Sequence, residues 1–221
     1  MSRLNFDLIG TGFMGKAHSI ALITCCTHLI NLAHYLIGPV RELFGQLASV
    51  HKERPDSQNG RMRTVENEAI AQVLLRCESG ASRSMEISRI ASGKKCGLTF
   101  ETIHTNGSVT FDQERMNELR IFESNDDQSR AGFRTILAGP EHSDYAKLCP
   151  AASHGLGIND LKVMEVRNVI AGMSSDNIIY PDLEEGWRVQ QVIKTMEISN
   201  IENKCIKVAD TYRQAAIAAA R

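Results

Sequence analysis

Three stretches of the chain hold residues whose types and spacing could do chemistry. The first is a G-x-G-x-x-G turn at residues 10–15, which follows a short run of alternating apolar residues. In such a turn the glycines let the backbone approach a pyrophosphate at a helix N-terminus. The candidate contacts for a dinucleotide cofactor are Gly10, Gly12, Phe13, Met14 and Gly15.

This turn lacks one partner that dinucleotide-binding units use. An Asp or Glu roughly 20 residues further on would hold the adenosine ribose. No acidic residue occurs between Lys16 and Arg41. Two interpretations therefore stay open: the glycines bind a cofactor, or they serve only as a turn from a strand into a helix.

The second stretch, residues 27–38, is predicted to be an amphipathic helix that stops at Gly38. Its polar side offers His28 as a candidate catalytic residue, because an imidazole titrates in the range that proton transfer requires. Asn31, on the same side, is a candidate substrate contact. The competing interpretation makes His28 a hydrogen-bonded helix residue without a catalytic role. The apolar side is predicted from residues at helical spacing: Leu29, Leu32, Ala33 and Leu36.

The third stretch, residues 154–160, joins a glycine-containing loop to a helix. His154 and Asn159 could contact substrate hydroxyls. Capping of the helix by Asn159 explains the same pattern, because Asn is favoured at helix starts. The remaining candidates are explained equally well by solvated faces of helices and strands: His34, Lys94, Lys95 and His104.

The elements around these stretches predict an α+β fold. Period-two alternation and turn residues predict strands that are antiparallel neighbours with one buried face, and Asn106-Gly107 predicts a tight hairpin. Residues 51–64 are predicted to be a mobile loop. A helix is expected from Asn159, and another after Pro181 with Asp182 as its cap. The apolar face of that last helix is predicted from Trp187, Val189, Val192, Ile193 and Met196. The predicted strands are 3–9, 42–50, 69–77, 81–91, 98–105, 108–112, 119–123, 133–137 and 205–208.

Together these elements predict one large, mainly antiparallel sheet with helices on one face. The other face of such a sheet would leave apolar side chains in water. A second copy of the chain would cover it, so we predict a homodimer or homotetramer built sheet against sheet.

Composition restricts the class of ligand. The 25 basic and 26 acidic residues are interspersed, which predicts neither nucleic-acid nor membrane binding. Six cysteines without C-x-x-C or zinc-type spacing predict free thiols and no metal site. No apolar run is long enough to span a membrane, and no secretory signal is recognisable. We expect a cytoplasmic protein that binds a small molecule.

Five segments in order resemble one known family. They are IGTGFMGKAH, THLINLAHYLIGPV, EAIAQVLLRCESGASRSMEISR, TIHTNGSVTFDQERMNEL and HGLGINDLKVMEV. Together they resemble the glucose-fructose oxidoreductase, inositol dehydrogenase and MocA family. The resemblance implies residues 1–23 as a remnant of the N-terminal dinucleotide-binding (Rossmann) domain, and residues 24–221 as the C-terminal α+β domain for substrate and subunit contacts. It also implies NAD or NADP as cofactor and a sugar, cyclitol or polyol as substrate.

The chain departs from the family's catalytic pattern. The family helix commonly begins D-x-G-x-H-x-x-D, with the histidine as acid/base, and these positions fall on Thr24, Cys26, His28 and Asn31. Only the histidine is kept, and the family's E-K-P lysine motif has no match. The resemblance therefore implies an NAD(P)-dependent oxidoreductase with impaired or lost activity; the alternative is a non-catalytic remnant that oligomerises or binds a ligand.

Overall fold

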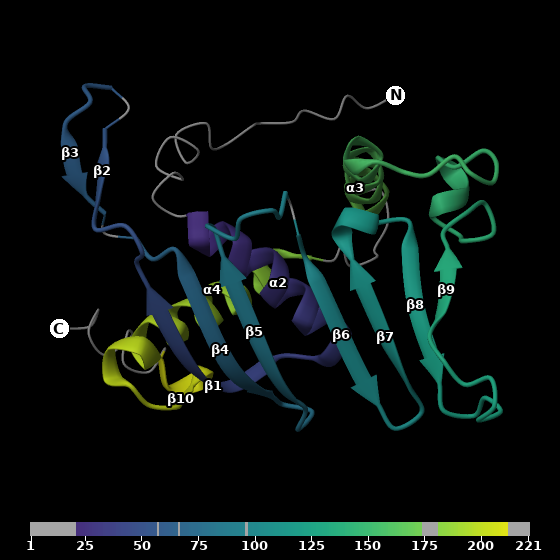
Figure 1. Cartoon of the computed structure of the whole chain (residues 1–221), viewed down its shortest axis with the longest axis horizontal. Coiled ribbons are helices and arrows are strands. Elements are labelled where there is room, and N and C mark those ends of the chain that lie inside the picture. Colours follow the sequence, from purple (N-terminus) through teal and green to yellow (C-terminus); the bar gives the residue numbers. More distant parts are fainter. Residues whose placement is uncertain (1–20, 57, 66, 96, 174–180, 212–221) are drawn as a thin grey trace. The chain divides into compact units, whose positions relative to one another are not determined.

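The structure, a computed structural model, describes residues 21–56, 58–65, 67–95, 97–173 and 181–211, except for the side chains of 21–25. The chain forms two compact units. Unit 1 comprises the described residues up to Ala91 and from Pro181 onward, and unit 2 comprises those from Ser92 to 173. Figure 1 labels the helices and strands of both.

Unit 1 is built on a four-stranded antiparallel sheet in the order β10-β1-β4-β5. Its strands are β1 (Val40–Ala48), β4 (Ile70–Cys77), β5 (Ser82–Ser88) and the short β10 (Ile206–Lys207). Strand β4 alternates as predicted: Ala71, Val73, Leu75 and Cys77 are buried, whereas the residues between them are exposed. This alternation gives the sheet one buried face and one open face.

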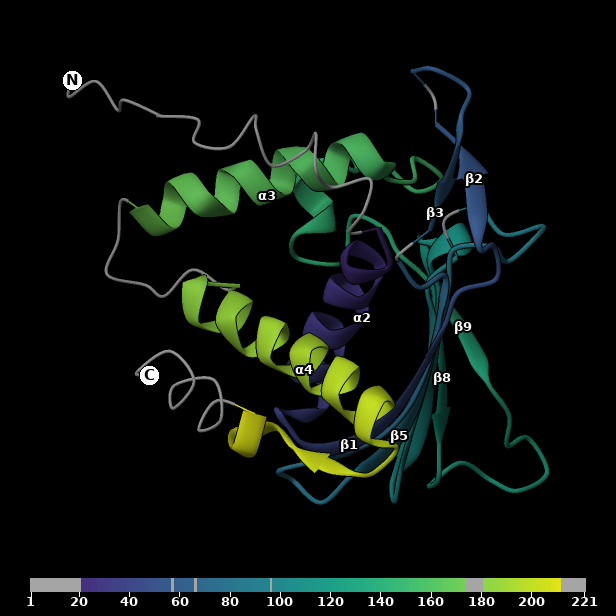
Figure 2. The same cartoon turned by 90° about the vertical axis from the view of Figure 1, so that its left-hand side faces the viewer.

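Two helices cover the buried face of this sheet, α2 (Ala21–Ile37) and α4 (Leu183–Glu202). Figure 2 shows both on the same side of β1 and β5. Burying apolar side chains between helices and sheet is the main stabilising contribution to such a layer. The core comprises Cys26, Ile30, Val40, Leu43, Ala71, Val73, Leu75, Cys77, Met85, Ile87, Val189, Val192, Ile193, Met196 and Val208.

The predicted apolar face of α2 was partly wrong. Leu36 is 38% exposed, whereas the buried row of the helix is Cys26, Ile30 and His34. These three residues follow one another at intervals of four and therefore share one side of the helix. A histidine can occupy this row because its ring nitrogens find partners, as described below.

For α4 the prediction held at four of five positions. Val189, Val192, Ile193 and Met196 are buried, but Trp187 is 55% exposed. At about 100° per residue, position 187 lies almost opposite positions 189 and 196. The indole therefore projects away from the core.

The predicted helix ends are confirmed. Gly38 adopts a φ of +103° and donates its N–H to the carbonyl of His34, which ends α2. The side chain of Asp182 accepts from the N–H of Glu185 at 2.8 Å and caps α4. Asn203, in the left-handed conformation, ends α4.

Side chains near the end of α4 also complete the hydrogen bonding of β1. The short β10 pairs only with Glu42 and Leu43. Further along β1, Gly45 N–H donates to Ser199 Oγ at 3.0 Å and Leu47 N–H donates to Asn200 Oδ1 at 2.9 Å. Helix side chains thus satisfy backbone groups that a neighbouring strand would otherwise pair.

The polar stretch 51–64 is more ordered than predicted. It forms an antiparallel ribbon of β2 (Glu53–Pro55) and β3 (Met62–Thr64). Asp56 closes the turn between them by accepting from Gln58 N–H and Arg63. These hydrogen bonds lower the pKa of Asp56.

Unit 2 contains the second four-stranded antiparallel sheet, in the order β6-β7-β8-β9. The predicted Asn106-Gly107 hairpin is confirmed between β6 and β7, where Phe100 and Phe111 stack with centroids 5.6 Å apart. Helix α3 has no buried residue. The elements of unit 2 are β6 (Thr99–His104), β7 (Gly107–Asp112), β8 (Glu118–Glu123), β9 (Arg134–Leu137), α3 (Ile158–Met173) and the 3-10 turns Gln113–Arg115 and Tyr145–Lys147.

The α+β class with antiparallel strands is confirmed. Hydrogen bonding nevertheless divides the expected single sheet into two four-stranded sheets and the β2–β3 ribbon. Between β5 and β6, the described residues 89–95 and 97–98 form turns and irregular chain rather than a tight hairpin loop. The expected division into residues 1–23 and 24–221 stays a prediction, because residues 1–20 lie outside the described part of the chain.

Two further properties follow from the described residues. None of their helices has the length and apolar content needed to cross a bilayer. Among their cysteines, Cys26, Cys77 and Cys149 are buried and Cys205 is exposed. Burial raises the pKa of the Cys77 thiol, because the charged thiolate is disfavoured away from water.

Candidate functional site

Helix α2 arranges three polar side chains in a row that runs from solvent into the core of unit 1. His28 is exposed, Asn31 is half-buried and His34 is buried. Successive members are three residues apart, so the row turns by about 60° at each step, from the exposed side of the helix to its buried side. The buried residue Ile30 fixes the helix against the sheet and determines which way this row faces.

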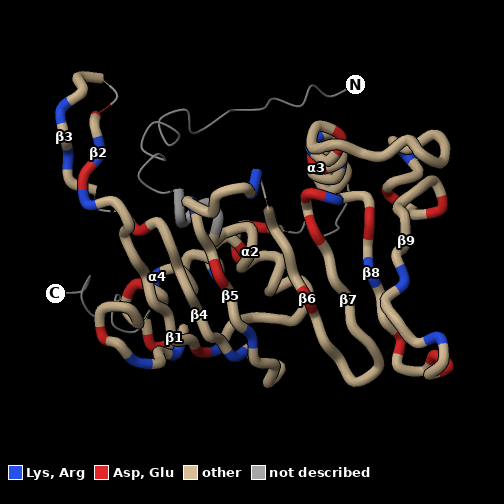
Figure 3. The backbone as a smooth tube through the Cα atoms, viewed as in Figure 1, with Lys and Arg blue, Asp and Glu red and all other residues tan. Residues whose placement is uncertain are grey.

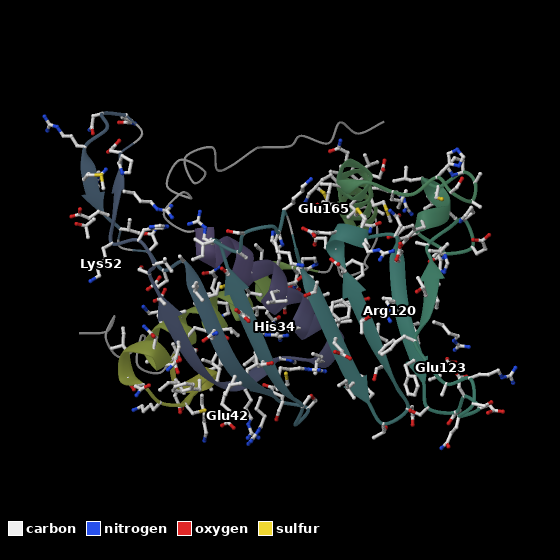
Figure 4. All side chains as sticks on the ribbon, viewed as in Figure 1. His34, Glu42, Lys52, Arg120, Glu123 and Glu165 are labelled. Carbon is white, nitrogen blue, oxygen red and sulfur yellow. The ribbon has the colours of Figure 1, made fainter. Side chains whose placement is uncertain are left out.

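The inner end of the row is a buried hydrogen-bonded pair between two helices. His34 Nδ1 lies 2.8 Å from Glu185 Oε1, and only 3% and 5% of the two side chains are exposed. The other ring nitrogen, Nε2, accepts from the backbone N–H of Val40 at 3.4 Å. Because Nε2 accepts, the proton of the neutral ring lies on Nδ1 and is donated to the carboxylate. Figure 4 labels His34 on α2.

Asn31 contacts the same carboxylate. Its Nδ2 donates to Glu185 Oε1 at 3.2 Å. One carboxylate oxygen therefore accepts from two successive turns of α2. This arrangement fixes the orientation of the Asn31 amide, because turning the amide over would place two acceptor oxygens against each other.

The environment of Glu185 compensates for its burial. The residue is the third of α4, where backbone N–H groups point toward the helix start and stabilise negative charge. The backbone N–H of Glu185 itself donates to Asp182 Oδ1 at 2.8 Å. A buried carboxylate with two side-chain donors and a helix N-terminus meets the condition under which burying a charge is tolerated.

Sequence reasoning missed half of this cluster. A solvated helix face explained His34 as well as a site did in the sequence, but His34 is 7% exposed. Glu185 was not among the candidate residues, whereas its side chain is the acceptor for both α2 residues. The available signal was the three-residue spacing of His28, Asn31 and His34; nothing local in the sequence indicated the acceptor 151 residues away from His34.

The third predicted stretch lies in unit 2. His154 is exposed, and its Nδ1 contacts the carbonyl of Ala152 at 3.3 Å. The predicted capping of α3 by Asn159 is wrong: the side chain of Asp160 accepts from Gly157 N–H at 2.8 Å, and Asn159 is exposed. Asn117 holds the loop by two hydrogen bonds of 2.9 Å to the backbone of Leu156. His154 and Asn159 as substrate contacts remain predictions.

The predicted cofactor contacts, Gly10, Gly12, Phe13, Met14 and Gly15, lie outside the described residues. A dinucleotide site of the predicted kind needs parallel strands joined through a helix. Every strand pairing within the described ranges is antiparallel. The described residues alone therefore do not fit a nicotinamide dinucleotide. They also contain no group of three side chains suited to holding a metal ion.

Comparison with known proteins finds the family that the sequence resembles. Residues 13–110 match the model of the GFO/IDH/MocA C-terminal domain. This match confirms the resemblance that the sequence indicated.

Its relatives are oxidoreductases by name. A levoglucosan dehydrogenase from Pseudarthrobacter phenanthrenivorans is 29% identical over 185 residues, which cover 78% of this chain and 47% of that protein. An NAD binding oxidoreductase from Klebsiella pneumoniae matches with a TM-score of 0.78 and 34% identity over 83% of this chain and 49% of that one. A levoglucosan dehydrogenase in complex with NADH and L-sorbose matches with a TM-score of 0.79 and 28% identity, covering 83% of this chain and 48% of that one. The chain thus spans about half the length of these relatives.

Proposed function

We propose that this chain supplies the substrate-binding part of a cytoplasmic NAD(P)-dependent oxidoreductase that acts on a sugar, cyclitol or polyol. The observation that supports this proposal most directly is the polar row of α2. His28 presents an exposed imidazole on a helix that buried hydrogen bonds hold in place. The match to the family's C-terminal domain and the NADH complexes among the similar structures support the nicotinamide cofactor. The six cysteines without C-x-x-C or zinc-type spacing support a reducing compartment.

Oxidation of a carbinol requires a group that accepts the hydroxyl proton. We assign this role to His28, and the assignment is supported by its exposed ring, while the inner residues of the row are hydrogen-bonded to Glu185. When bound, a nicotinamide cofactor supplies the hydride acceptor. We propose impaired activity for this chain, because the carboxylates of the family's helix motif are replaced by Thr24 and Asn31 and the E-K-P lysine motif has no match.

We expect the protein to bind polyols measurably, and His28→Ala to weaken the binding. Trp187, the chain's single tryptophan, stands one helical turn beyond the start of α4 and can report binding by its fluorescence. Levoglucosan and L-sorbose, the compounds named for the relatives, are suitable probes. Where turnover with NAD or NADP is detectable, His28→Ala should lower it about 10²- to 10⁴-fold, as expected for loss of a general base.

The control is His51→Ala, which removes another exposed histidine of unit 1. Equal binding and turnover in wild type and His28→Ala would contradict the catalytic assignment. Titration with NADH and NADPH under nicotinamide fluorescence tests the cofactor separately. No change up to millimolar cofactor would contradict cofactor binding by this chain.

The second candidate function is a non-catalytic protein that oligomerises or binds a polyol without converting it. The absent E-K-P motif and the uniformly antiparallel pairing of the described strands favour it. Polyol binding without turnover at any cofactor concentration would support this second candidate. Turnover that disappears in His28→Ala would exclude it.

We further propose that the open face of the unit 1 sheet associates with a second copy of the chain. Leu74 on β4 is 62% exposed and stands opposite the half-buried Phe44 of β1 in the sheet register. The face is more polar than the sequence suggested, since Gln72 and Arg76 flank Leu74. Acidic and basic residues are mixed along the described elements (Figure 3).

Leu74→Arg is expected to convert the assembly to single chains, because it places a charge in the centre of the proposed contact. Sedimentation or light scattering measures the mass. Leu183→Arg is the control, since Leu183 is 94% exposed but belongs to α4, on the opposite side of the sheet. An unchanged mass in Leu74→Arg, or a single chain already in wild type, would contradict association through this face.

A further inference from the structure

Helix α2 contains no acidic residue. The carboxylate nearest its polar row comes instead from α4, a distant part of the sequence. Glu185 reaches Asn31 at 3.2 Å and His34 at 2.8 Å. The row thus begins with an exposed imidazole and ends on a buried carboxylate.

We infer that Glu185 is a positioning residue for the proposed polyol site. By hydrogen bonding to Asn31 and His34, it fixes the Asn31 amide and the register of α2 against α4, and thereby fixes where His28 faces solvent. This inference rests on the proposed function, since it assigns Glu185 its role in that site. Glu185 itself is buried and takes no direct part in chemistry.

The types of the two residues are complementary. An amide at position 31 donates to a carboxylate at position 185. An acid at both positions would bring two carboxylates within about hydrogen-bond distance, where they cannot both stay ionised at low cost. An amide at both positions would weaken the pair, because hydrogen bonds to a charged partner are the stronger kind. A charge-assisted hydrogen bond therefore forms only when one position carries an amide and the other a carboxylate.

This complementarity gives a direct test by exchange. Asn31→Asp and Glu185→Gln are made singly and together, and the binding of levoglucosan is followed by Trp187 fluorescence and by calorimetry. Each single variant should bind roughly tenfold more weakly. In the double variant the amide nitrogen at position 185 can donate to the carboxylate at position 31 while the amide oxygen accepts from His34 Nδ1, so both partners stay satisfied and affinity should recover to within about threefold of wild type.

The control is Glu184→Gln, which alters the neighbouring residue of α4 by the same chemistry. Glu184 pairs at the surface with Arg188, and 67% of its side chain is exposed. We expect unchanged affinity. Urea unfolding of all variants shows whether an affinity loss accompanies loss of the fold.

The outcomes separate the two claims. If wild type binds polyol and the single variants bind equally well, the positioning role is overturned while the proposed function stands. Failure of the double variant to recover affinity, with all variants folded, also overturns it. If wild type binds no polyol, the proposed function falls, and with it the role of Glu185 in a polyol site. Urea unfolding of the single and double variants then shows only whether the side chains at positions 31 and 185 are coupled in their effect on stability.

Discussion

Glu185→Ala is expected to lower the free energy of unfolding by about 3 kcal/mol, among the largest effects of a single substitution in this chain. Removing the carboxylate leaves the Nδ1–H of His34 and the Nδ2–H of Asn31 without their acceptor. At the His34 site, 3% of the side chain is exposed, so water does not readily replace the lost partner. An unsatisfied buried donor costs about 1–3 kcal/mol, which applies in full to His34, and the weakened hydrogen bonding of the half-buried Asn31 adds to it.

Urea unfolding followed by far-UV circular dichroism measures this effect. The control is Glu184→Ala, whose side chain is mostly exposed and whose ion pair with Arg188 lies at the surface. Exposed pairs contribute about 0–1 kcal/mol, so the control should stay close to wild type. If Glu185→Ala lowers the free energy of unfolding by less than about 1 kcal/mol, the hydrogen bonds of Glu185 with Asn31 and His34 do not stabilise the packing of α2 against α4.

Gly107→Ala is expected to destabilise the sheet of unit 2 by about 2–3 kcal/mol. Gly107 has a φ of +156° at the start of β7, which is unfavourable for residues with a Cβ. A Cβ there would lie 2.2 Å from the carbonyl oxygen of Phe122 on β8. This obstacle is backbone rather than a flexible side chain, so the hairpin or its neighbouring strand must shift.

Gly60→Ala separates the two causes. Gly60 has a φ of +68°, but no atom lies within 4 Å of the position that its Cβ would take. Only the conformational cost of about 1 kcal/mol applies there. Hydrogen exchange of the β6, β7 and β8 amides, together with thermal unfolding, compares the variants. Equal effects of the two substitutions would contradict the steric contribution of Phe122.

Local chemistry made much of the fold predictable. Asp182 and Gly38 act through neighbours within four residues, so the ends of α2 and α4 could be predicted. Alternation along β4 and the Asn106-Gly107 turn likewise act locally. The separation of the strands into two sheets was not predictable, because it depends on the irregular chain between β5 and β6 rather than on either strand.

The candidate site was predictable only at its exposed end. His28 and Asn31 could be found from spacing within one helix. The burial of His34 could not, since an isolated histidine on a helix is equally compatible with solvent. It depends on Glu185, and the two approach only when α2 and α4 pack on the same sheet. Tertiary pairing of this kind leaves no periodic signal in either segment.

The hydrogen bonds from β1 to α4 have a consequence for how copies of the chain can meet. An unpaired strand edge invites a strand from another molecule, which leads to uncontrolled growth of the sheet. Here Ser199 and Asn200 occupy the N–H groups of Gly45 and Leu47, beyond the two residues that β10 pairs. An incoming strand would have to displace both side chains from the helix. This edge of β1 is therefore protected against pairing with strands of other molecules, the process that leads to fibres.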